Sequence, residues 1–175
     1  MTENEPGIRR MCVALCAGKA GLLAAACRSG GWGRLLVQDD PGSSAEIGVA
    51  QPGIDELALL GGLVSDLVRE IIAAAGPPAR AFLAVDVGIV RLTRNGFGGA
   101  VLSRAAELAA NSFIAAAAGR RDCPDVAGHG LIVVIPDGLF ADLRAEGEPC
   151  AGWQRVAPAA AWFRSFQRDP QGKGC

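Results

Sequence analysis

The stretch FLAVDVGIVRLTRNGFGGAVLSRAAEL, from Phe82 to Leu108, decides the fold of this chain. Its first part belongs to a run rich in branched apolar residues, 80–92, which predicts a central β-strand. Asn95 and Gly96 form a turn signal, and the apolar pattern after them predicts a helix over about 100–118. A long strand is therefore expected to lead through a glycine-rich turn into a long helix.

The residues before this stretch predict two strand and helix units. Residues 10–17 are typical of a buried strand and 20–28 of a short helix. Two short apolar runs, 34–38 and 46–50, flank the turn sequence DDPGSS and predict an antiparallel hairpin. Asp55 is placed to cap a helix whose apolar residues recur every three or four positions until Gly76-Pro77-Pro78.

The residues after the stretch predict a buried strand at 130–135, a short helix at 136–144 and a terminal hairpin at 154–156 and 160–166. The order is βαββαβ, followed by a C-terminal helix and edge strands. It predicts an α+β, ferredoxin-like fold with its helices on one face of a mainly antiparallel sheet. We expect a polar leader at 1–9, one domain at 10–166 and a disordered tail at 167–175.

Composition excludes several classes of protein. A length of 175 residues suits one domain, and 20% charged residues with a net charge of -1 argue against a nucleic-acid partner. The polar N-terminus lacks the features of a secretory signal, and the apolar runs are shorter than a membrane span. We therefore predict a cytoplasmic protein without a membrane partner, whose six cysteines remain thiols.

Phe82 to Leu108 resembles the second half of a class III nucleotidyl cyclase domain, in which a strand and a glycine-containing turn lead through a GxxFGxAV-like motif into a helix. LIVVIPDGLFADL, from Leu131 to Leu143, is similar to the next strand and helix of that family. QPGIDELALLGGLVSDLVREI, from Gln51 to Ile71, is similar to the preceding helix of its small actinobacterial members. The resemblance covers about residues 36–145 and implies a cyclase homology domain in a regulatory or effector role.

The resemblance also implies which catalytic groups are missing. Active members hold two metal ions with one acid from the first strand and one from the hairpin turn, and the metals neutralise the triphosphate. The first strand ends here in Leu15-Cys16-Ala17-Gly18, and Ser43 or Ser44 falls at the hairpin position. A hydroxyl group does not replace an anionic ligand for a hard dication at comparable affinity.

The Asn and Arg that the family carries on the following helix are also replaced. They orient the ribose and stabilise developing phosphate charge, and their positions fall at Leu102 and at Ala106 or Glu107. Arg104 is two residues out of phase and would point about 200° around the helix from Leu102. The resemblance thus implies a degenerate domain, a pseudo-cyclase.

Three acids are candidates for a displaced metal site: Asp39, Asp40 and Asp86. Asp39 and Asp40 stand in the hairpin where a shift of register would let them bind metal, although turn formation explains them as well. Asp86 interrupts an apolar strand, either as a buried functional acid or as a structural acid beside Arg91 or Arg94. If these acids act, the cofactor is Mg²⁺ or Mn²⁺ with a nucleotide; otherwise we expect none.

Two further patterns carry weaker signals. Asn95, Gly96, Gly98 and Gly99 would suit a phosphate at the start of the following helix, and tight turning explains them equally well. The cysteine and histidine spacings match no zinc site: Cys123 and His129 give Cys-x5-His, and Cys12 and Cys16 lie about 13 Å apart along a strand.

The sequence favours a catalytically inactive cyclase-like module that acts by nucleotide sensing or by protein-protein interaction, as a homodimer or with a related chain. The alternative is an active class III cyclase that uses the displaced acids or is completed by a partner chain. An unrelated ferredoxin-like interaction domain would show a different order of strands.

Overall fold

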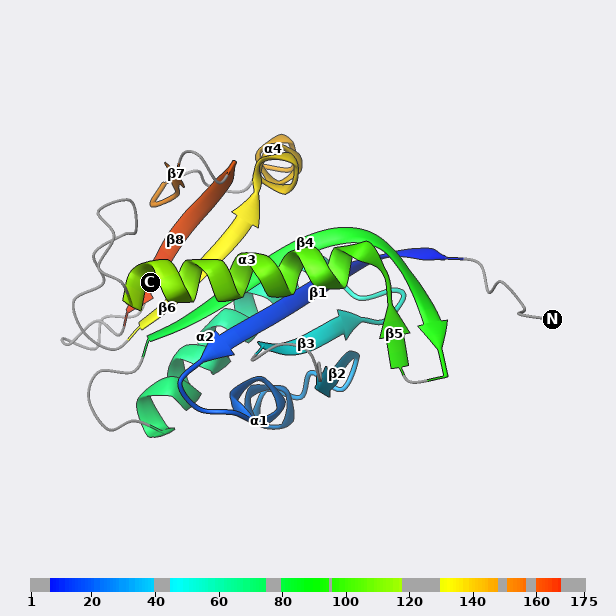
Figure 1. Ribbon diagram of the computed structural model, residues 1–175, viewed down its shortest axis with the longest axis horizontal. Helices are drawn as coiled ribbons and strands as arrows, with labels where there is room; N and C mark the ends of the chain where they lie inside the picture. Colours follow the sequence, from blue (N-terminus) through cyan, green and yellow to red (C-terminus); the bar gives the residue numbers. More distant parts are fainter. Residues whose placement is uncertain are drawn as a thin grey trace.

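One open sheet forms the centre of the protein, as the computed structural model shows (Figure 1). The structure describes residues 7–39, 45–74, 80–94, 96–117, 130–147, 151–156 and 160–167. In these residues the sheet order is β2-β3-β1-β4-β6-β8-β7, and β5 pairs with β4. The strands are β1 (Ile8–Ala17), β2 (Leu35–Asp39), β3 (Ala45–Ala50), β4 (Arg80–Thr93), β5 (Gly96–Gly98), β6 (Gly130–Pro136), β7 (Gln154–Val156) and β8 (Ala161–Gln167).

The first six elements form the predicted ferredoxin-like unit. Strand β1 is followed by α1 (Leu22–Ser29), the β2-β3 hairpin, α2 (Glu56–Ala74) and β4. The order β2-β3-β1-β4, with antiparallel neighbours, is that of the split βαββαβ arrangement. The only parallel pairing among the described strands joins β4 to β6, which α3 (Ala100–Ala117) connects by crossing the sheet. The predicted α+β fold with a mainly antiparallel sheet is confirmed.

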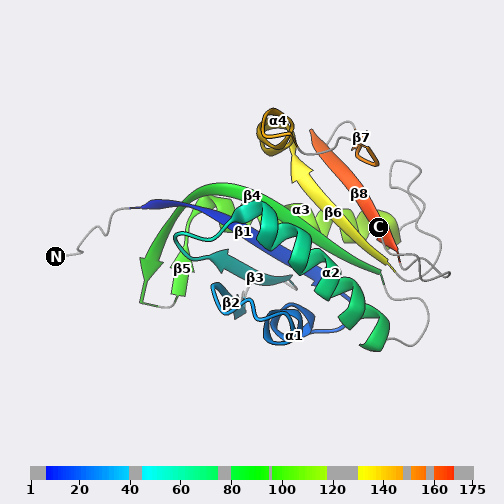
Figure 2. The ribbon, with the colours of Figure 1, turned by 180° about the vertical axis from the view of Figure 1, so that it is seen from behind.

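The placement of the helices differs in one respect from the prediction. Helices α1, α2 and α4 (Asp137–Ala145) pack on one face of the sheet, but α3 covers the opposite face (Figures 1 and 2). The side chains of β1 show this division, since Met11 and Leu15 pack with α1 and α2 while Cys12 and Cys16 pack with α3. A strand covered on both faces is a continuous apolar run instead of alternating, as β1 is from Met11 to Ala17.

Helix α2 is the long amphipathic helix expected from the sequence. Its buried residues are Leu59, Leu63, Val64, Leu67 and Ile71. The carboxylate of Asp55 accepts a hydrogen bond from the backbone N–H of Ala58 at 3.0 Å, the predicted N-terminal cap. Such a cap contributes about 1 kcal/mol.

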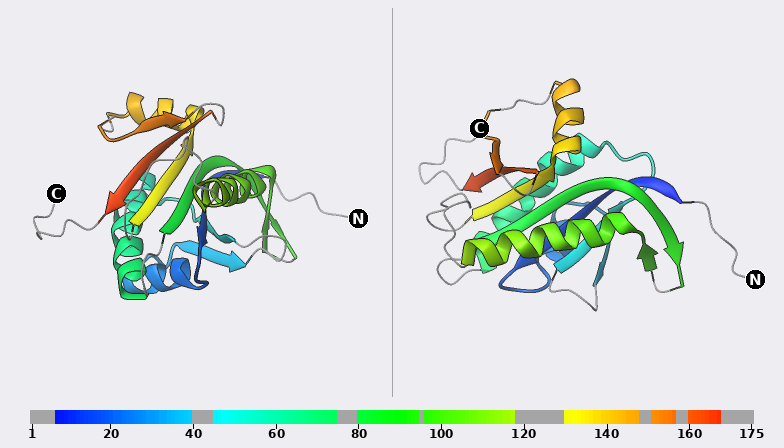
Figure 3. Two further views of the ribbon diagram at one scale, coloured as in Figure 1. Left: turned by 60° about the vertical axis from the view of Figure 1, so that its left-hand side comes forward. Right: turned by 45° about the horizontal axis from the view of Figure 1, so that its top comes forward.

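Two parts of the sheet extend beyond its central strands. The long, curved strand β4 continues past its neighbours and pairs with β5 as a two-stranded arm (Figure 3). At the other end β8 and β7 form the predicted antiparallel terminal hairpin, and Trp162 of β8 stacks on Phe140 of α4 with 3.8 Å between ring centroids. No helix of the described residues is long and apolar enough to span a lipid bilayer.

Strand β1 already begins at Ile8, two residues earlier than the sequence indicated. Residues 1–6 of the expected leader and 168–175 of the expected tail lie outside the described residues. The division into leader, domain and tail stays a prediction.

Candidate functional site

The corner where β1 ends and the β2-β3 hairpin returns is the place at which the cyclase resemblance puts two metal-binding acids. Strand β1 ends at Ala17, whose side chain has no ligand atom, and Cys16 pairs with Ala45 at the start of β3. The two serines that take the hairpin position, Ser43 and Ser44, lie outside the described residues. Pairing across β1 and β3 therefore brings the end of β1 next to the start of β3.

A buried acid that the sequence analysis did not single out occupies this corner. Glu46 is only 8% exposed, and its carboxylate accepts backbone hydrogen bonds from Leu22 at 3.0 Å and from Ala24 at 3.4 Å. These are first-turn N–H groups of α1, a helix without a side-chain cap of its own. Unpaired N–H groups and the helix dipole favour a negative charge there, so Glu46 acts as the cap from a neighbouring strand.

The expected catalytic positions on α3 face the protein interior. Leu102 and Ala106 are 5% and 4% exposed and pack in the core between α3 and the sheet. Glu107, the other candidate for the Arg position, is exposed. The buried part of this helix offers no polar group at the positions where the family carries Asn and Arg.

Asp86 pairs with Arg104 of α3, a partner that the sequence did not indicate. One carboxylate oxygen of Asp86 accepts a hydrogen bond from Nε of Arg104 at 2.9 Å and forms an ion pair with Nη2 of the same guanidinium, also at 2.9 Å. The other oxygen accepts from the N–H of Val87 at 2.8 Å. Arg91 and Arg94, the two partners expected from the sequence, are exposed. Helix α3 folds back over β4, so that residues 18 apart in the chain meet.

Asp39 and Asp86 are not brought together by the sheet. Asp39 is the last residue of β2 and pairs with Glu46 of β3, whereas Asp86 is in β4 opposite Cys12. Two strands, β3 and β1, separate β2 from β4, which corresponds to roughly 14 Å at ordinary strand spacing. Asp40 lies outside the described residues.

The glycine-rich turn is held by the hairpin. The side-chain amide of Gln38 donates to the carbonyl of Phe97 at 3.2 Å and accepts from its N–H at 2.8 Å. Gly96 and Gly98 belong to β5, and Asn95 lies outside the described residues. Gly99 has φ 147°, and a Cβ atom there would lie 2.5 Å from the carbonyl oxygen of Ile89. Backbone geometry thus accounts for this glycine without a bound phosphate.

The described cysteines behave as packing residues. Cys12 and Cys16 are buried under α3, and burial raises the pKa of the Cys12 thiol to about 12. The Cys123 and His129 pair lies outside the described residues. Within the described residues no group of three or more His, Cys, Asp or Glu side chains is arranged to hold a metal ion.

The described residues of the β1 and hairpin corner, which leave out 40–44, do not fit a pair of divalent cations. Hard cations need several oxygen ligands, but the side chain of Ala17 supplies none and both carboxylate oxygens of Glu46 already accept backbone N–H bonds. We therefore derive no metal-dependent step at this corner.

Solved structures of cyclases share this fold. The adenylate/guanylate cyclase/hydrolase from Silicibacter pomeroyi superposes with a TM-score of 0.50 and 14% identity, over 94% of this chain and 100% of that one. The guanylyl cyclase Cya2 gives a TM-score of 0.48 and 12% identity, over 95% of this chain and 97% of that one. No protein-family model matches the sequence. No curated protein matches it either. The chain has the fold of a nucleotidyl cyclase homology domain.

Proposed function

We propose that this chain is a cyclase homology domain that forms no cyclic nucleotide and acts as a regulatory or effector module through binding. Its output is a change in association or conformation, with a second copy or a related chain as partner and a nucleotide as candidate ligand. The cyclase fold supports the general assignment, and the contents of the β1 and hairpin corner support the loss of catalysis.

The observation that carries the proposal is the position of Glu46. An active site of this fold needs positive charge in this corner, because two metal ions there neutralise a triphosphate. Here Glu46, opposite Leu15 of β1, caps α1 with a buried carboxylate and puts a negative charge in the corner. A triphosphate without its metals would be repelled by that charge.

Helix α3 independently supports the proposed loss of catalysis. Leu102 and Ala106 are part of the core, so their replacement by the Asn and Arg of an active member would place polar groups among apolar neighbours. In this chain these two positions pack in the core and carry no catalytic group. Arg104, the one basic side chain described on this helix, is held by Asp86.

The arm of β4 and β5 supports association with a second chain. Ile8, Ile89 and Leu92 are large apolar residues that are 50%, 54% and 58% exposed, and all three lie in this part of β1 and β4. Apolar side chains that gather at one end of a sheet favour a protein interface. We infer that a dimer forms through this arm.

The test is incubation of the purified protein with ATP, GTP, CTP and UTP in the presence of Mg²⁺ or Mn²⁺. Chromatography detects cyclic products, a thermal-shift reading in the same samples detects binding, and light scattering gives the mass in solution. We expect no cyclic product from the protein or from the Asp39→Ala/Asp40→Ala double variant. A nucleotide-dependent rise in Tm would identify a sensor, and a dimer mass without such a rise would identify a protein-binding module.

A cyclic product that disappears in the Asp39→Ala/Asp40→Ala variant would overturn the proposal and establish the alternative, an active cyclase with displaced acids. A product that survives in this variant would overturn it equally and would direct attention to Asp86. Asp86→Asn is then the informative variant, since it keeps the shape of the side chain and removes its charge.

A further inference from the structure

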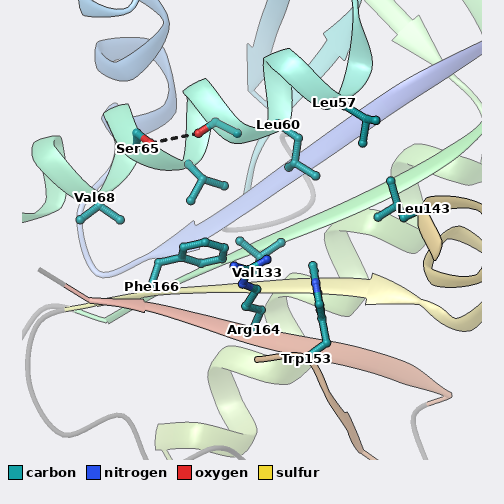
Figure 4. Close-up of a pocket in the computed structure, with 11 residues that line it drawn as sticks. Leu57, Leu60, Ser65, Val68, Val133, Leu143, Trp153, Arg164 and Phe166 are labelled. Atoms are coloured by element: carbon teal, nitrogen blue, oxygen red, sulfur yellow. Dashed lines mark hydrogen bonds between the residues drawn. The ribbon is translucent and has the colours of Figure 1, made fainter. Parts of the chain in front are cut away.

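The layer of helices on the α2 side ends before the strands beneath it do. Helix α2 begins at Glu56 and α4 ends at Ala145, while the first residues of β1 and the arm of β4 and β5 extend past α2 (Figure 2). A hollow of about 390 Å³ lies where the helices end. Leu57 and Leu60 of α2 and Leu143 of α4 line it, and they stand on the facing sides of the two helices (Figure 4). A helix-lined hollow therefore adjoins a strand surface that no helix covers.

One face of β4 continues from this hollow onto the arm. Side chains alternate along a strand, so Val85, Val87, Ile89 and Arg91 lie on the same face. The two valines line the hollow. Arg9 of β1 also lines it and is the strand partner of Ile89, which places Ile89 on the face of the hollow. Ile89 is 54% exposed, and Arg91 beyond it is exposed as well.

The hollow carries an excess of negative charge. Its charged lining residues, within the described part of the chain, are Glu56, Asp142, Glu146 and Arg9. Asp142 pairs with Arg9 at 3.8 Å, and Glu56 is in the first turn of α2, where the helix dipole favours an acid. Glu146 follows the last residue of α4, where the dipole disfavours an acid, and Arg144 before it does not line the hollow. A cation from outside is therefore favoured at Glu146.

We propose that this face is an interface with a second copy of the chain, in which Arg91 of each copy binds Glu146 of the other. The face is complementary to itself, because it is acidic at the hollow, apolar at Ile89 and basic at Arg91. A twofold axis at Ile89 places position 91 of one copy opposite position 87 of the other, which lines the hollow. Both arginines then meet an acid, and both isoleucines leave water.

The inference rests on the dimer proposed above and names the surface through which it forms. Leu92 alternates to the other face of β4, so Ile89 and not Leu92 lies at the centre of the interface. The surface is on the side of the sheet opposite to α3. A dimer of this kind leaves α3 uncovered in both copies.

Sedimentation equilibrium at low salt, over a series of protein concentrations, tests the proposal by reversing charges. Arg91→Glu and Glu146→Arg each bring like charges together at two symmetric contacts, so each should weaken the dimer about tenfold. The double variant Arg91→Glu/Glu146→Arg exchanges the two charges and should dimerise like the wild type. An equimolar mixture of the two single variants should also dimerise, because each contact then joins opposite charges. Glu107→Arg, an exposed change on α3, is the matched control and should leave the dimer unchanged.

Recovery of the dimer in the mixture and in the double variant confirms the pairing of Arg91 with Glu146. The proposal is overturned if either single reversal leaves the dimer as stable as the wild type, or if the combinations do not restore it. Ile89→Ser and Leu92→Ser separate this failure from that of the proposed function. A dimer weakened by Leu92→Ser and not by Ile89→Ser would overturn this surface and keep the dimer through the arm. A wild type that stays monomeric would overturn both, and the nucleotide assay would still decide whether the chain is a cyclase.

Discussion

Replacement of Glu46 by alanine tests the capping role that sets the charge of the β1 and hairpin corner. The variant leaves the N–H groups of Leu22 and Ala24 without their acceptor, and it removes a buried negative charge from the positive end of α1. The solvation that a buried carboxylate loses on folding offsets part of this effect.

The expected loss of stability in Glu46→Ala is the sum of two contributions, the hydrogen-bonding cap and the charge at the helix end. The cap is worth about 1 kcal/mol, and a charge at a partly buried helix end adds about 1–2 kcal/mol. We therefore expect Glu46→Ala to lower the free energy of unfolding by about 2–3 kcal/mol. For a chain of this size Tm should fall by about 5–10 °C. Glu46→Gln keeps one acceptor oxygen without the charge, so it should lower the free energy of unfolding by about half as much as Glu46→Ala.

Urea denaturation followed by circular dichroism, at one fixed protein concentration, measures these differences. The control is Glu107→Ala, which removes an exposed glutamate from α3 and should change stability by less than about 0.5 kcal/mol. If Glu46→Ala were no less stable than Glu107→Ala, the capping argument would be refuted. If Glu46→Gln were as stable as the wild type, hydrogen bonding and not charge would explain the role of Glu46; if it were destabilised as much as Glu46→Ala, the charge would explain it.

Two titrating groups give further predictions. Burial raises the pKa of Cys12 to about 12 and that of Cys27 to about 11, so peptide mapping after iodoacetamide treatment at pH 8 should find Cys12 unmodified until the protein unfolds. Extensive early labelling of Cys12 would contradict this. Because its pKa is higher in the folded state, this thiol favours folding below about pH 9 and loses that effect as pH rises toward 12. A hydrogen bond from Arg155 lowers the pKa of Asp137 below 3.8, so the pair favours folding at neutral pH and loses its effect as pH falls through the folded-state pKa. Arg155→Gln should move the NMR titration midpoint of Asp137 upward, and an unchanged midpoint would show that the pair is not formed in solution.

Much of the fold could be predicted because its signals are local. The spacing of leucines in α2, the capping position of Asp55 and the turn residues between β2 and β3 each act within a few residues of the chain. The order of strands and helices follows from these signals and from the resemblance of residues 82–108 to the cyclase pattern. The absence of an acid from Leu15 to Gly18, where the resemblance implies a metal-binding acid, could also be read from the sequence.

The partners of the polar side chains could not be predicted in this way. Asp86 was expected beside Arg91 or Arg94, its neighbours in sequence, but it pairs with Arg104 because α3 returns across β4. Glu46 had no distinguishing signal, since an acid at the start of a hairpin strand is ordinarily solvated. Its role depends on the N-terminus of α1, which is 24 residues earlier in the chain.

The sequence by itself determined which segments are helix and strand, their order, and the absence of an acid at the end of β1, since these depend on residue type and local spacing. Only the tertiary structure decided that α3 covers the second face, that Glu46 caps α1, and that an acidic hollow adjoins the exposed face of the arm. These features arise where distant segments pack together. The physical reason is that a side chain's charge and hydrogen bonds take effect through its neighbours in space, and the packing of the sheet selects those neighbours.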